Sequence, residues 1–95
     1  MPTYVVLYNL TEQGRKDIQS LADRMDDAKA RAAEAGITVV GSYVTMGPYD
    51  LVTIVDAPND AAVARGAAAI LERGNVTSLT MRAFTTTEWR EATKS

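Results

Sequence analysis

The chain has 95 residues, of which 46% are hydrophobic and 23% charged, and its net charge at pH 7 is −2. This length suits a single domain over residues 1–95, and the composition is that of a globular rather than a disordered protein. The acidic balance and the absence of any Lys/Arg run argue against a nucleic-acid-binding face. The chain contains no Cys and no His, which excludes disulfides, thiolate nucleophiles, Ser–His–Asp machinery and the usual zinc or copper sites.

The chain enters its first apolar segment directly, without a charged and apolar leader. No apolar run approaches the roughly 18–20 residues that span a bilayer. We therefore expect a cytoplasmic chain with no membrane segment, no cofactor and no metal site.

A strand is expected first, because residues 3–10 are rich in β-branched and aromatic side chains. Thr11 suits the N-cap of a helix, but Gly14 weakens the first turn, so the helix is expected to restart near Ser20. Apolar and Ala positions then recur at helical spacing as far as Gly36, a residue type that commonly ends helices.

Two further strands are expected at residues 37–46 and 51–57. The connection between them, residues 47–50 (GPYD), contains Gly and Pro and is short. A connection of this length makes the two strands an antiparallel hairpin.

A second helix is expected next, with Asp60 as its N-cap, followed by a fourth strand at residues 75–85. Thr86 or Thr87 is expected to cap a short terminal helix. We expect Trp89 to pack this helix onto a partner or across the mouth of a cleft.

The order of these elements is βαββαβ, which predicts an α+β, ferredoxin-like fold. Right-handed crossovers give a four-stranded antiparallel sheet in the order 4-1-3-2, with both helices on the same face. The second face of the sheet is then left without a cover from the chain itself.

Side chains alternate between the two faces of a strand, so each strand carries two sets. One set is uniformly apolar and is expected under the helices: Val5, Leu7, Val40, Val44, Val52, Ile54, Leu79, Met81 and Ala83. The other set mixes aromatic, hydroxyl and cationic side chains: Tyr4, Val6, Tyr8, Gly41, Tyr43, Thr45, Leu51, Thr53, Val55, Ser78, Thr80, Arg82 and Phe84. Because this mixed set is too apolar for water, we expect a second copy to cover it in a homodimer or higher homo-oligomer.

Two such sheets facing each other would enclose a cleft for a small-molecule ligand. Its predicted ligand-binding residues are Tyr8, Tyr43, Thr45, Tyr49, Asp50 and Arg82. Asp50 could accept a proton or a cationic ligand group, or it could hold the neighbouring turn by accepting backbone N–H groups. Arg82 could hold a bound carboxylate, or form an ion pair with Asp50 or Asp56 of either subunit.

The segment at residues 46–51 (MGPYDL) resembles the motif for which the GYD domain family is named. Further segments fit the same family, so that the resemblance covers essentially the whole chain: residues 11–14, Gly36 and residues 57–60, 74–76 and 82–85. The family is similar in fold to the dimeric α/β-barrel superfamily, so the resemblance implies a dimeric α/β barrel. It implies no activity. The Gly-x-Tyr-Asp hairpin is also similar to one in feast/famine transcriptional regulators, where it contributes to amino-acid binding between subunits.

Three functions remain open from the sequence. The first is a small-molecule-binding or regulatory oligomeric domain with a ligand cleft between subunit sheets. The second is a cofactor-independent enzyme, monooxygenase- or isomerase-like, acting on a small aromatic or acidic metabolite. Its base would be Asp50, its proton donor Tyr8 or Tyr43, and Arg82 would steady an anionic intermediate. The third is a structural oligomerisation protein, in which the mixed face is only an interface.

Overall fold

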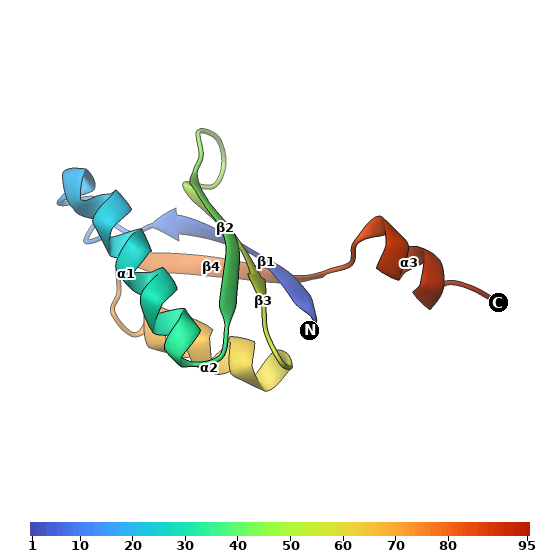
Figure 1. The fold of residues 1–95 in the computed structure, drawn as a ribbon. Helices are drawn as coiled ribbons and strands as arrows, with labels where there is room; N and C mark the ends of the chain where they lie inside the picture. The colour runs from blue at the N-terminus through green and yellow to red at the C-terminus, as the bar shows by residue number, and fades with distance from the viewer.

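The computed structural model describes all 95 residues. Its elements, with a 3-10 turn before the first helix, are β1 (Thr3–Leu10), Ile18–Ser20, α1 (Leu21–Glu34), β2 (Thr38–Val44), β3 (Leu51–Asp56), α2 (Asp60–Leu71), β4 (Val76–Ala83) and α3 (Thr86–Ala92). The strands form one antiparallel sheet in the order β2-β3-β1-β4. The predicted ferredoxin-like fold and strand order are therefore confirmed. Figure 1 shows α1 and α2 packed beside the sheet and α3 standing apart from it. None of the helices combines the length and apolar character that crossing a bilayer requires.

The segment between β1 and α1 is a tight turn held by Thr11. Its hydroxyl accepts the N–H of Gly14 at 3.1 Å and donates to the C=O of Gly74 at 2.7 Å. Thr11 therefore joins the end of β1 to the α2–β4 loop. Its hydroxyl accepts an N–H three residues on, as a helix N-cap does, but the turn does not continue as a helix, in agreement with the break expected at Gly14. The helix begins at Leu21, next to the predicted restart at Ser20.

The N-terminus of α2 is capped by Asn59, whose Oδ1 accepts the N–H of Ala62 at 2.9 Å. The prediction of Asp60 as the cap is thus wrong by one position. Asp60 is instead the first helical residue, and its carboxylate accepts a hydrogen bond from the hydroxyl of Tyr4 in β1. This contact ties the start of α2 to the sheet.

The cap of α3 is Thr85, one position before the predicted Thr86 or Thr87. Its hydroxyl accepts the N–H of Glu88 at 3.0 Å, and its own N–H donates to the Glu88 carboxylate at 2.8 Å. These reciprocal bonds form a capping box, and they hold the pKa of Glu88 below its usual value. The capping box therefore fixes the residue at which α3 begins.

The helices cover the mixed set of side chains, so the predicted assignment of the two faces is wrong. Tyr4, Val6, Leu51 and Val55 are buried. Residues directly opposite in an antiparallel ladder share a face, and the uniformly apolar positions of β1 pair with those of β3 and β4 on the other side. We call this uncovered side the open face; its central residues are Val5, Leu7, Gly41, Tyr43, Val52, Ile54, Leu79 and Met81.

A β-bulge at Val40 decides which side chains β2 gives to each face. Val39 lies opposite Val55, but the next paired residue is Gly41, opposite Ile54. The extra residue reverses the alternation from Gly41 onward. Tyr43 consequently lies on the open face.

The packed core lies at the two ends of the helix-covered side. One cluster contains Tyr4, Ile37, Val55 and Ala57, and the other contains Leu10, Leu21 and Leu51. Along β1, Val6 and Tyr8 lie between these clusters. Above this middle section α1 and α2 present mostly small residues, and the core is not filled there.

Candidate functional site

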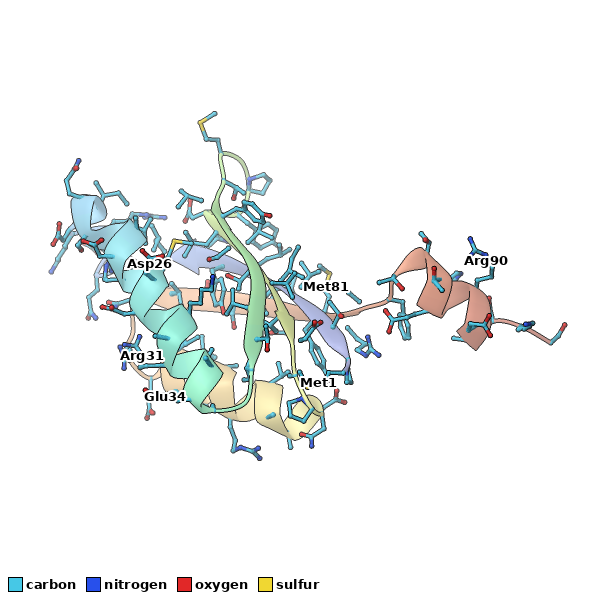
Figure 2. All side chains as sticks on the ribbon, in the orientation of Figure 1. Met1, Asp26, Arg31, Glu34, Met81 and Arg90 are labelled. Carbon is cyan, nitrogen blue, oxygen red and sulfur yellow. The ribbon has the colours of Figure 1, made fainter.

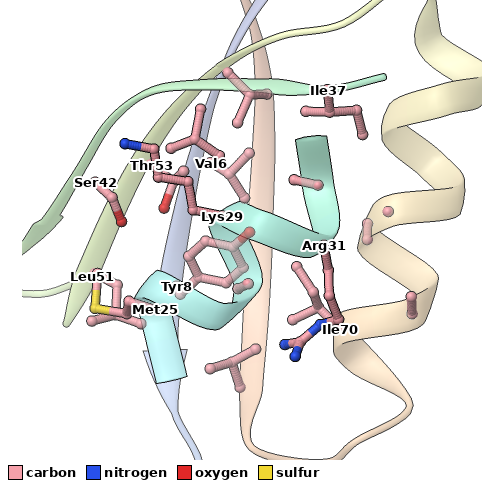
Figure 3. Close-up of a pocket in the computed structure, with 18 of the residues that line it drawn as sticks. Val6, Tyr8, Met25, Lys29, Arg31, Ile37, Ser42, Leu51, Thr53 and Ile70 are labelled. Carbon is pink, nitrogen blue, oxygen red and sulfur yellow. The ribbon is translucent and has the colours of Figure 1, made fainter. Parts of the chain in front are cut away.

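A cavity of about 530 Å³ lies between the sheet and the helices α1 and α2. Figure 3 shows Tyr8, Ser42 and Thr53 on its sheet side and Met25, Lys29 and Arg31 on the side of α1. Its helical walls contain many small residues: Ala28, Ala32, Ala35, Ala62, Gly66, Ala67 and Ala69. Side chains of this size cannot fill the space above the central strands, and the cavity follows from that.

The sheet side of the cavity carries hydroxyl groups. Tyr8, Ser42, Thr53 and Thr80 line it, and none of these hydroxyls takes part in a hydrogen bond within the chain. Burial raises the pKa of Tyr8 above its ordinary value near 10.0, so its phenol stays neutral and is available as a donor. Ser42 and Thr80 are exposed and open to water, whereas Tyr8 and Thr53 are half-buried on the sheet, where a core built only for packing would place apolar side chains.

The cavity also gathers positive charge. Half of the ten basic residues line it, but only one of the twelve acidic residues does, namely Asp27. The basic residues are Arg24, Lys29, Arg31, Arg65 and Arg73. None of them has a carboxylate within 4.0 Å, and the ion pair that the chain does form joins Lys94 to Glu91.

Arg24 is held at one end of the cavity. Its Nη2 donates to the C=O groups of Gly14 and Asp17 at 3.2 and 2.9 Å. Its Nε is buried and has no hydrogen-bond partner. A donor left in this state is costly, and a polar group entering the cavity could relieve it.

The six predicted ligand-binding residues do not form one site. Tyr8 lines the cavity, whereas Tyr43 is 56% exposed on the open face. The Tyr43 ring lies against Gly41, where a Cβ would come within 2.9 Å of its atoms. The two tyrosines proposed to share a cleft are therefore separated by the sheet.

Asp50, Thr45 and Tyr49 belong to the hairpin between β2 and β3. The Asp50 carboxylate accepts the N–H of Leu10 at 2.8 Å, and its own N–H donates to the C=O of Tyr8 at 2.9 Å. The Thr45 hydroxyl donates to the C=O of Tyr49 at 2.7 Å. Asp50 thus has the second of its predicted roles, that of holding backbone N–H groups, although the donor belongs to β1 and not to the turn.

Arg82 is exposed and forms no ion pair with Asp50 or Asp56 within the chain. Its guanidinium donates to the C=O of Thr3 at 3.2 Å and also to that of Ala83. It lies 4.4 Å from the centre of the Phe84 ring and 5.7 Å from that of Tyr4. These contacts place Arg82 at the start of the C-terminal segment and away from the cavity.

The residues that follow β4 form an exposed arm, which we define as residues 84–95. Phe84 and Trp89 meet edge to face with ring centres 5.8 Å apart, and Trp89 is 59% exposed. Figure 2 shows Arg90 of α3 well apart from the sheet that carries Met81. The arm therefore presents an aromatic pair that the rest of the chain does not cover.

Comparison with known proteins identifies the family. Residues 4–93 match the GYD domain. The "Glutamine synthetase and cystathionine beta-lyase binding protein" of Thermus thermophilus is 34% identical over 85 residues, covering 88% of this chain and 90% of that protein.

Among solved structures, TTHA0845 from Thermus thermophilus superposes with a TM-score of 0.60 at 25% identity, over 90% of this chain and 96% of that one. The hypothetical protein PHS023 from Pyrococcus horikoshii gives a TM-score of 0.64 at 20% identity, over 90% of this chain and 92% of that one, a likeness that shows the fold alone. On the family match and the relative together, the chain belongs to the GYD domain family.

Proposed function

We propose that the chain is a regulatory binding module that self-associates through its open face and docks on a metabolic enzyme. The observation that carries this proposal is the open face, which is apolar on all four strands and has no cover within the chain. Leu79 and Met81 on it are 47% and 42% exposed. A contiguous apolar surface of this kind is uncommon on a monomer and typical of an interface.

The size of the open face fits a partner of the same kind. Four strands about 4.8 Å apart and about seven residues long outline a face of about 19 Å by 23 Å. This outline covers roughly 440 Å², about half of the ~800 Å² that each partner buries in a standard interface, and the exposed arm is the further surface that would add to it. Two copies related by a two-fold axis would pair open face to open face, giving the dimeric α/β barrel expected from the family resemblance.

The relative supports an enzyme as the second partner. Its name states that it binds glutamine synthetase and cystathionine β-lyase. We extend this kind of binding to the present chain because the two sequences align along nearly their whole lengths.

The placement of the candidate catalytic residues favours binding over catalysis. Asp50, the expected base, is engaged by the N–H of Leu10. Tyr8 and Tyr43, the expected proton donors, lie on opposite faces of the sheet. Arg82 of β4 lies opposite Tyr4 in the strand pairing, at the end of β1 away from Asp50. The acid and the base expected from the sequence are therefore not brought together.

Light scattering coupled to size-exclusion chromatography tests the self-association. We expect the wild type to be larger than a monomer and the Leu79→Lys/Met81→Lys variant to be a monomer with an unchanged circular dichroism spectrum. Ala33→Lys/Ala64→Lys adds the same two charges to exposed positions on the helices and is expected to behave as the wild type. A monomeric wild type would contradict the proposal.

Docking on an enzyme is tested separately with purified glutamine synthetase and immobilised wild-type chain. We expect the immobilised wild type to retain the enzyme. If the Ala33→Lys/Ala64→Lys variant loses this retention, the enzyme binds at the helices; if it keeps it, the enzyme binds elsewhere on the chain. If the enzyme passes through unretained at micromolar concentrations, the proposed partner is wrong, whatever the oligomeric state.

A further inference from the structure

We propose that the cavity between the sheet and the helices α1 and α2 binds an amphipathic carboxylate. The apolar body of the ligand lies among the alanines, and its carboxylate lies between Arg31 of α1, Arg65 of α2 and Arg73 of the loop that follows α2. This site is on the opposite side of the sheet from the open face. The proposed ligand binding can therefore be tested separately from the proposed self-association.

The space and lining fit the apolar body. Cavities that enclose small ligands measure roughly 300–1,000 Å³ and are mostly apolar; this one measures about 530 Å³, with 18 of its 29 lining residues hydrophobic. An apolar group inside the cavity would make dispersion contacts with the alanine and valine side chains of its lining. A hydrocarbon chain or an aromatic ring system is such a group.

The charges at the cavity select an anion. Arg31 and Arg65 come from opposite walls, and Figure 3 shows Arg31 lying between α1 and α2 beside Ile70. Neither arginine has a carboxylate partner in the chain, although the chain holds more acidic than basic residues. The guanidinium fork matches a carboxylate with two parallel hydrogen bonds, so a single acid group could engage both walls.

The hydroxyl groups on the sheet side of the cavity are hydrogen-bonding groups within an otherwise apolar lining. Tyr8, Thr53 and Thr80 can donate to a water or to an oxygen along the body of the ligand. The neutral Tyr8 phenol is suited to this, because a phenolate would repel an anion.

Isothermal titration calorimetry on the full chain tests the site with two probes, decanoate below its micelle concentration and 2-naphthoate. We expect at least one to bind with one molecule per chain. Decanol and decylammonium, which keep the body of decanoate and change its head group, should bind at least about tenfold more weakly, because they lose charge-assisted hydrogen bonds.

Matched variants locate the binding. Arg31→Gln/Arg65→Gln should weaken binding by about tenfold or more, whereas Arg15→Gln/Arg90→Gln removes two cations outside the cavity and should leave it unchanged. Ala67→Leu fills the cavity and should abolish binding, whereas Ala64→Leu on the exposed side of α2 should not.

Three outcomes would overturn the proposal. The first is that neither probe binds. The second is equal affinity for decanoate and decanol, or no effect of the Arg31→Gln/Arg65→Gln change. The third is binding that survives Ala67→Leu but is lost in Leu79→Lys/Met81→Lys, which would place the probe on the open face.

Discussion

Replacing Asp50 with alanine tests whether this carboxylate holds the sheet together. Its Oδ2 accepts the N–H of Leu10 at 2.8 Å, while its N–H and C=O bond to Tyr8 and Thr45 at 2.9 and 2.8 Å. The substitution leaves both backbone bonds in place and removes only the acceptor for Leu10. Leu10 is the last residue of β1, and its side chain is buried in the cluster with Leu21 and Leu51.

The expected loss of stability follows from that single hydrogen bond. A bond to a charged group contributes roughly 1.5–3 kcal/mol. Asp50 is partly exposed, so water compensates in part and we expect about 2 kcal/mol. In a domain of this size each kcal/mol lowers the melting temperature by about 4–8 °C, which predicts a drop of about 8–16 °C. Asp50→Asn keeps a neutral acceptor and should lose about half as much.

Thermal unfolding followed by circular dichroism measures the effect. Protein concentration must be fixed, because association makes the melting temperature depend on it. Asp26→Ala is the control: Asp26 is exposed on α1, makes no hydrogen bond, and should change stability by less than about 0.5 kcal/mol. If Asp50→Ala melts together with the wild type and this control, the carboxylate does not hold β1 and the reasoning is refuted.

Three further changes test other contacts. Gly14→Ala would place a Cβ 2.1 Å from the C=O oxygen of Asn75, so urea unfolding should show a loss of roughly 1–3 kcal/mol; an unchanged midpoint would mean that this close approach does not exist. The hydrogen bond to Asp60 raises the pKa of Tyr4 above its ordinary value near 10.0. The stability that this bond gives is full below pH 10 and is lost as the pH rises through the raised pKa. Tyr4→Phe should therefore flatten the alkaline decline in melting temperature, and identical slopes would count against the bond. Removal of residues 85–95 deletes α3 and should leave the circular dichroism melt of the remaining chain within a few degrees, while sedimentation shows weaker self-association; collapse of the fold would show that the arm belongs to the core.

The order of the elements was predictable because local signals and chain connectivity leave one arrangement. Gly36 and Gly74, with φ of 81° and 77°, stand after α1 and α2 in the left-handed conformation that favours glycine. Right-handed crossovers then set the order of the strands. Both inferences need only turn residues and a general rule of handedness.

The assignment of the two sheet faces could not be predicted in the same way. Alternation divides the side chains of a strand into two sets, but a uniformly apolar set suits an interface as well as a core. The bulge at Val40 adds a second difficulty, since a period of two along β2 places Tyr43 on the wrong side. Gly41 is a mark of the bulge in the sequence, since a glycine inside a strand often accompanies one, but the pairing with β3 decides which side chains change face.

The cavity was missed for a related reason. The alanines of α1, such as Ala28 and Ala32, suggest close approach of the helix to the sheet, and the distance that decides between close packing and a void is not in the sequence. Of the six predicted ligand-binding residues, Tyr8 alone lines the cavity. A usable signal did exist at Arg65, which stands among small and apolar residues of α2 with no acidic residue within one helical turn.

The concentration of cations around the cavity gives the molecule two electrical poles. With five cations and one carboxylate at the cavity, the other five cations share the remaining surface with eleven carboxylates. A small anion is therefore attracted at one side of the protein and repelled over most of the rest, which orients its approach before contact. At physiological ionic strength this influence extends over about 8 Å. The rate at which an acid enters should accordingly fall with added salt, whereas the rate for a neutral molecule of the same shape should not.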